Sequence, residues 1–233
     1  MRIPILILAA ALSLLAVAPA SAADRNFSVT SFTRIRVDGP YRLRVTTGVA
    51  PFATASGSAH GLDGVAIDVQ GTTLVVHSNG ASWGGYPGES SGPIEIAIGT
   101  HDLTAAWING SGALAINAVR GMSFDLSVQG SGNATIDRVA VDQLRVGLSG
   151  AASARLSGQA AQVTAIVRGS SSFDGSALEA KNATVGAEGP SVVRVNVRDT
   201  VKIDARGTAS VSLTGGAACV VKAIGSANVD GCR

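Results

Sequence analysis

Four arginines near the start of the chain form the densest group of side chains suited to binding. Arg34, Arg36, Arg42 and Arg44 alternate with apolar residues on both sides of Asp38-Gly39-Pro40. We expect two adjacent strands, joined as a hairpin or around a sharp corner, with all four guanidinium groups on one face. The planar guanidinium fork suits carboxylates and phosphates, so the group predicts weak, salt-sensitive binding of an anionic polymer. The alternatives are that the arginines solvate a strand edge or pair with acids from elsewhere in the fold.

Three aromatic side chains form a second candidate contact surface. Trp83 and Tyr86 lie in a Gly/Ser-rich stretch, 79–92, that interrupts the strand pattern, and Trp107 occupies an outward position of a later strand. Aromatic side chains are enriched at interfaces, so these residues predict contact with a sugar or a protein partner. The alternative is that they cover an open edge of the fold and block strand addition.

The two cysteines, Cys219 and Cys232, lie six residues before and seven residues after Gly225. This placement predicts a disulfide around a chain reversal, which an exported protein permits. A metal or catalytic role has little support, because Cys219 falls on an apolar position and no histidine is near it in the sequence.

Metal binding, cofactor binding and catalysis find no supporting pattern. His60, His77 and His101 are the three histidines, and their spacing matches no metal-ligand motif. Phosphate-binding and nucleophile motifs are missing, and so is a cluster of acids such as polysaccharide-cleaving enzymes need. We therefore expect no catalytic residue, metal or cofactor, and keep a polysaccharide-acting enzyme as a remote alternative.

Residues 1–22 predict a secretory signal peptide. Arg2 precedes an apolar run and then small residues, and we expect cleavage after Ala22 or one residue later. The run is short for a transmembrane helix, and no later segment resembles a membrane span. The formal net charge of +2 argues against a dedicated nucleic-acid binder. The remainder, 23–233, predicts a single domain of an exported protein that is periplasmic, surface-bound or extracellular.

These candidate residues are positioned by a repeat that begins near residue 104. A glycine returns every 18–20 residues, and the residues six, four and two places before it are nearly all apolar. The seven glycines are Gly110, Gly130, Gly150, Gly169, Gly189, Gly207 and Gly225. Alternation of period two indicates strands, and self-similarity at this period indicates stacked identical units. The sequence therefore predicts an all-β parallel β-helix, or β-solenoid.

The repeat also predicts which residues of neighbouring coils lie side by side. Aligning the glycines puts Asp174 between Arg155 and Arg194, and Glu188 between Arg168 and Arg206. Such columns of alternating charge favour the assigned register. We expect seven regular coils over 101–233. Less regular strands in 24–100, at 32–37, 41–46, 52–56, 65–70, 73–78 and 93–98, should cap the stack, and no segment has a convincing helical period.

The chain resembles the bacterial head GIN domain, a domain of unknown function attributed to the heads of autotransporter adhesins. The resemblance is carried by the stretch 32–45, by 62–76 and by the Gly-Ser-Gly-Asn and Gly-Ser-Ala-Asn corners at 130–133 and 225–228. It implies a parallel β-helix, export and adhesion, and it brings no catalytic residues.

Two functions remain open on these grounds. The first is an exported, non-catalytic binding or adhesion module of the bacterial cell envelope, which contacts a glycan, an anionic polymer or a protein. The second is a structural envelope protein that forms homo-oligomers through the ends of the solenoid.

Overall fold

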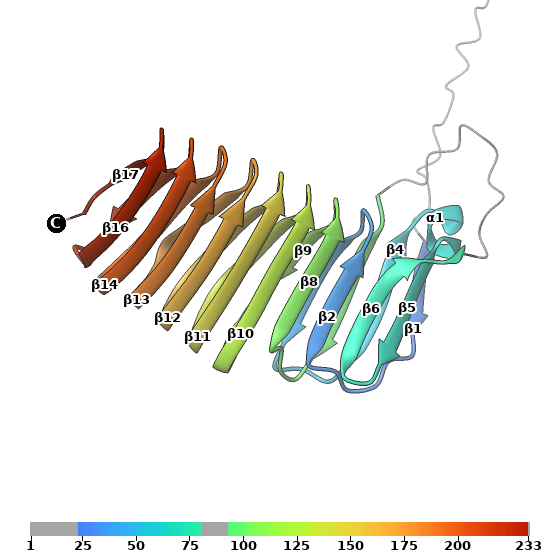
Figure 1. Cartoon of the computed structure of the whole chain (residues 1–233). Helices are drawn as coiled ribbons and strands as arrows, with labels where there is room; N and C mark the ends of the chain where they lie inside the picture. The colour runs from blue at the N-terminus through green and yellow to red at the C-terminus, as the bar shows by residue number, and fades with distance from the viewer. Residues whose placement is uncertain (1–22, 81–92, 233) are drawn as a thin grey trace, which may run out of the picture.

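The computed structural model describes residues 23–80 and 93–232, which form a β-solenoid (Figure 1). Its coils have two broad faces, which we call the Trp107 face and the Arg44 face after one outward residue of each. The strands confined to the Trp107 face are β5 (Val65–Gln70), β6 (Thr73–Ser78), β2 (Arg34–Asp38), β8 (Ala105–Gly110), β10 (Val119–Gly130) and β16 (Ala218–Gly225).

The Arg44 face and the strands that run around both faces complete the solenoid. The strands of the Arg44 face are β1 (Ala23–Phe27), β4 (Phe52–Gly57), β7 (Glu95–Thr100), β3 (Arg42–Thr47), β9 (Ala113–Ile116), β15 (Ser210–Thr214) and β17 (Asn228–Asp230). Those that contribute to both faces are β11 (Asn133–Gly150), β12 (Ser153–Arg168), β13 (Ser172–Glu188) and β14 (Val192–Gly207). Pairing between coils is parallel from β2 and β3 to β16 and β17, which confirms the predicted parallel β-helix.

The order of the coils in space differs from their order in the chain. Strand β2 pairs with β6 on one side and β8 on the other, and β3 pairs with β7 and β9. The coil formed by β2 and β3 therefore lies inside the stack, between a coil made later in the chain by β6 and β7 and the coil of β8 and β9. Because β2 and β3 lie on opposite faces of one coil, the turn at Gly39 is a sharp corner and not a hairpin.

The glycine corners stack as the repeat predicts. Gly130 lies beside Gly110 and Gly150 in the strand register, and its φ is +105°. A Cβ atom at Gly130 would lie 2.6 Å from the carbonyl oxygen of Gly110. Both the positive φ and the close approach of the neighbouring backbone require glycine at this corner.

The core runs along the axis of the solenoid. The apolar residues of the repeat point inward and are buried, including Phe124 and Phe173. The exceptions lie in the first and last coils of the repeat. Thr104 is exposed and its hydroxyl donates to the carbonyl of Thr33 (3.1 Å). In the last coil Val221 (43%) and Ala223 are exposed, and Cys219 and Val229 are half-buried, because among the described strands β16 pairs only with β14 and β17 only with β15.

The N-terminal end of the stack is closed by antiparallel strands and a short helix. Strand β1 pairs with β4, β4 with β7, and β5 with β6, all antiparallel. Helix α1 (Ala59–Asp63) packs beside β1, β4 and β5, and its N-terminus is capped by Ser58, whose side chain accepts from the Gly61 amide (3.1 Å). The sequence did not predict α1, because five residues are too short to show a helical period.

Candidate functional site

Trp107 and Arg36 are direct neighbours on the Trp107 face. Their strands, β8 and β2, pair in parallel with Arg36 opposite Trp107. Alternation directs the flanking residues Ile35, Ala106 and Ile108 into the core, where they are fully buried, so Arg36 and Trp107 point outward. The fold thus places one of the four arginines beside one of the three aromatic residues, although the sequence predicted them as two separate contact surfaces.

A shallow pocket of about 390 Å³ lies around this pair. Its lining residues come from β5, β6, β2 and β8 and are Gln70, Thr73, Val75, Arg36, Trp107 and Asn109. Val75 faces outward, opposite Arg36, yet it is only 1% exposed. It therefore forms an apolar floor, and the pocket combines that floor and an indole with polar groups from four strands.

Asp38 holds two of the polar groups in place. Its carboxylate accepts a hydrogen bond from Nε of Arg36 (2.9 Å) through one oxygen and from Nδ2 of Asn109 (2.6 Å) through the other. The Arg36 side chain remains 44% exposed. Among the described residues, the side-chain hydrogen bond of Arg36 is made by Nε to Asp38. The two terminal nitrogens of the guanidinium can therefore donate to an acceptor on a ligand.

The four arginines of the opening stretch do not share one face. Arg34 and Arg36 are exposed on the Trp107 face, whereas Arg42 and Arg44 are exposed on the Arg44 face, because β2 and β3 have different neighbours. Arg42 lies opposite Glu95 of β7. The single patch expected from two adjacent strands is therefore wrong in its geometry, and two pairs take its place.

The other predicted contact residues lie outside the described part of the chain. Trp83 and Tyr86 fall in 81–92, and the predicted signal peptide falls in 1–22. Of the aromatic group, Trp107 alone belongs to the described residues, and it is half-buried.

The histidines lie apart from one another. His60 is in α1 and His101 follows β7, both exposed, while Nε2 of His77 lies 3.1 Å from the Asp68 carboxylate. The carbonyl of Ser78 and the Asp68 carboxylate both raise the pKa of His77. Within 23–80 and 93–232 no three His, Cys, Asp or Glu residues come together as a metal site.

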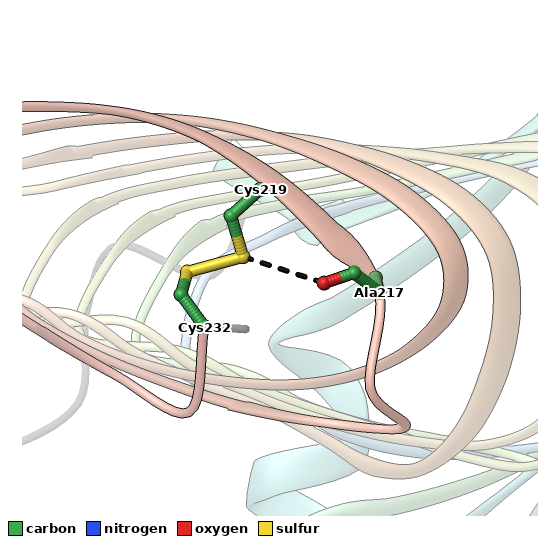
Figure 2. The surroundings of a disulfide bond; sticks show 3 residues. All are labelled: Ala217, Cys219 and Cys232. Carbon is green, nitrogen blue, oxygen red and sulfur yellow. Dashed lines mark hydrogen bonds between the residues drawn. A yellow bond between two sulfur atoms is a disulfide. The ribbon is translucent and has the colours of Figure 1, made fainter.

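The predicted disulfide joins Cys219 of β16 to Cys232, with 5.8 Å between their Cα atoms (Figure 2). It ties β16, which precedes the corner at Gly225, to the residues that follow β17. The Cys219 sulfur also lies 3.7 Å from the carbonyl oxygen of Ala217. A disulfide sulfur carries no proton, so this approach is a contact and not a hydrogen bond.

The predicted charge columns have the expected register. Asp174 lies opposite both Arg155 and Arg194, and Glu188 lies opposite both Arg168 and Arg206. One ion pair forms in each column, Arg155–Asp174 (3.2 Å) and Arg168–Glu188 (3.1 Å). Arg206 instead pairs with Asp204 on its own strand (2.8 Å). These charged residues thus form ion pairs both between neighbouring coils and within one strand.

Sequence reasoning missed the polar and apolar surroundings of Trp107. Val75, Gln70 and Thr73 belong to strands that were predicted with the observed bounds, but the sequence did not show which strands lie next to them. The pairing of β6 with β2 could not be predicted from the sequence, because three strands, β3, β4 and β5, intervene between them in the chain.

No helix in the described part of the chain has the length and apolar character needed to cross a membrane.

Solved structures with the same fold come from Bacteroides and Parabacteroides species. A "putative adhesin" from Bacteroides fragilis has a TM-score of 0.79 at 17% identity, covering 90% of this chain and 97% of its own. A "putative adhesin" from Parabacteroides merdae has a TM-score of 0.69 at 15% identity, covering 91% and 96%. A "putative lipid binding protein" from Parabacteroides distasonis also has a TM-score of 0.69, at 14% identity, covering 91% and 98%.

Comparison with curated proteins gives no match. A family model does match, over residues 31–217, which is most of the chain and includes every residue of the Trp107 pocket. The chain belongs to the family described as "putative auto-transporter adhesin, head GIN domain".

Proposed function

We propose that this protein is an exported, non-catalytic binding module of the bacterial cell envelope that contacts its ligand through the pocket around Trp107. The observation that carries the proposal is the convergence of an indole, an apolar floor and an oriented guanidinium in one outward pocket. Ligand pockets typically combine apolar and aromatic surface with a few placed polar groups. The family description and the names of the similar structures, adhesins and a lipid-binding protein, support a binding role over an enzymatic one.

Export is part of this proposal. The predicted signal peptide at 1–22 and the disulfide between Cys219 and Cys232 both fit an oxidising compartment. A disulfide that closes the last coil persists outside the cytoplasm, where thiol reductants are scarce.

The test is retention of purified protein on immobilised envelope polymers, namely lipopolysaccharide, peptidoglycan and capsular polysaccharide, at low salt. Trp107→Ala should abolish retention on whichever surface holds the native protein. Met122→Ala is the matched control, because Met122 is 80% exposed on β10 and lies outside the pocket. Retention that is absent for the native protein, or equal for both variants, would rule out the pocket as the contact site.

Self-association through the end of the solenoid is the second candidate function. Among the described strands β16 pairs on one side only, and it carries three large exposed apolar residues, Val220, Val221 and Ile224. An exposed apolar edge strand favours pairing with another strand. Light scattering over a range of concentrations tests this candidate. Ile224→Lys should keep the protein monomeric if β16 mediates assembly, and a native protein that is monomeric throughout contradicts it.

A further inference from the structure

The Trp107 pocket carries an inference about the class of ligand, which rests on the proposed binding function. We propose that it binds a sugar bearing a carboxylate, as a uronic acid does, with the ring against the Trp107 indole and the carboxylate on the Arg36 guanidinium.

The apolar part of the pocket suits the face of a sugar ring. Trp107 presents an aromatic surface that is half-buried. Val75, two strands away, lies beneath the pocket but is only 1% exposed, so the indole provides nearly all of the apolar contact surface. Adjacent strands lie about 4.8 Å apart, so Arg36 stands one strand spacing from Trp107. A ring resting on the indole would direct a carboxylate at its edge toward Arg36.

The Arg36 guanidinium is oriented for a planar anion. Asp38 engages Nε and so fixes the plane of the group, which leaves the terminal nitrogens as a fork. Such a fork binds a carboxylate through two parallel hydrogen bonds. Asp38 also fixes Asn109 through Nδ2, which leaves Oδ1 of Asn109 as an acceptor for a sugar hydroxyl. Gln70 and Thr73 provide further hydrogen-bonding groups at the opposite side of the pocket.

The shape of the pocket favours an acidic sugar over a lipid with a phosphodiester headgroup. Carboxylate and phosphodiester groups both carry a single negative charge at neutral pH, so charge does not distinguish them at the one guanidinium of the pocket. Its apolar lining is limited to Val75 and Trp107, so the pocket lacks the surface to hold an acyl chain.

The experiment compares oligogalacturonate with the same oligomer after methyl esterification, which removes the charge and keeps the rings. Trp107 and Trp83 are the two tryptophans of the chain, so a Trp83→Phe background makes Trp107 fluorescence the binding signal. We expect the acid form to bind at least tenfold more tightly than the ester. Arg36→Ser should reduce that ratio to about one, and Arg36→Lys should restore only part of it, because lysine keeps the charge without the fork.

Arg44→Ser is the charge-matched control. Arg44 lies on the opposite face between Ala97 and Ala115, so its loss changes the net charge equally without touching the pocket. The acid-to-ester ratio should remain as in the native protein. An equal fall for Arg36→Ser and Arg44→Ser would overturn the proposal in favour of diffuse electrostatic attraction. Arg36 and Arg44 both face outward, and melting curves of their variants verify that the fold is retained.

Two further results separate this inference from the binding function itself. Equal, Trp107-dependent binding of acid and ester would overturn the acidic-sugar inference while leaving the binding function intact. Arg36-dependent binding to phosphatidylglycerol vesicles, with no binding of oligogalacturonate, would overturn it in favour of a lipid headgroup. No binding of the acid oligomer to the native protein would also overturn it, whereas the retention test on envelope polymers would still decide the broader function.

Discussion

The carboxylate of Asp174 accepts a hydrogen bond of 3.2 Å from Nε of Arg155, 19 residues earlier and one coil away. Asp174 also lies opposite Arg194 of the next coil. One acid thus lies between two arginines. The sign of the charge at position 174 therefore determines whether the side chains of three successive coils attract or repel one another there.

Replacing Asp174 by Arg should destabilise the protein by about 1 kcal/mol or more, because opposite charges across strands become like charges on both sides. Thr135→Arg, one coil before Arg155 in the same row, should cost less, since Arg155 keeps Asp174 as its partner. Chemical denaturation measures both. Equal losses for the two variants would contradict the electrostatic contribution of the column.

Removing the Ser176 hydroxyl should make the free energy of unfolding depend less on pH in the acidic range. The pKa of Asp174 lies below its ordinary value of 3.8, first because Ser176 donates to it (2.7 Å) and further because of Arg155. A lowered folded-state pKa stabilises the protein above 3.8, and this contribution is lost as pH falls through the folded-state pKa. Ser176→Ala should therefore lower the free energy of unfolding at pH 7. The gap to the native protein should close in strong acid, and a gap of constant size would contradict this account.

Gly150→Ala should be far more harmful than Gly48→Ala. Both glycines have positive φ, +93° and +80°, so both variants incur backbone strain of about 1–2 kcal/mol. At Gly150 the new Cβ would also lie 2.6 Å from the carbonyl oxygen of Gly130, whereas at Gly48 nothing lies within 4 Å. Thermal denaturation should show a large difference between the two. Similar melting temperatures would mean that neighbouring coils can separate at a corner without penalty.

The disulfide should stabilise the last coil and leave the rest of the stack unchanged. Cys219 and Cys232 are 13 residues apart, and a closed loop of about this length contributes on the order of 3 kcal/mol. Coils of a solenoid contact only their neighbours, so the effect should stay local. In the variant with both cysteines changed to serine, amide exchange should accelerate in β16 and remain slow in β11. The native protein should be two hydrogens lighter than its reduced form, and two free thiols in the exported protein would contradict the bond.

The periodic part of the fold was predictable because its information is local. Each glycine marks a corner, and the alternation before it assigns the inward residues, so the register of Asp174 with Arg155 and Arg194 follows by counting. The strands at 65–70 and 73–78 were also predicted with the observed bounds.

The candidate site was only half predictable. Trp107 and Arg36 were singled out for their chemistry, but their contact depends on β2 pairing with β8 about 70 residues later in the chain. No repeat or turn encodes a pairing at that separation, and the sequence favoured β3 as the neighbour of β2 because it comes next. Val75 and Gln70 were missed for the same reason, since their place in the pocket depends on β6 pairing with the other side of β2.

The enclosed coil of β2 and β3 has a mechanical consequence. In a simple solenoid each terminal coil is held by one neighbour, so the stack unravels from either end one coil at a time. Here a pull on the N-terminal side first separates β1 from β4 and then reaches a coil bonded to β6, β8, β7 and β9. That coil can leave only by breaking four strand pairings together, whereas the coils nearest β16 peel away singly. The N-terminal part of the chain is therefore harder to pull out of the stack than the C-terminal part.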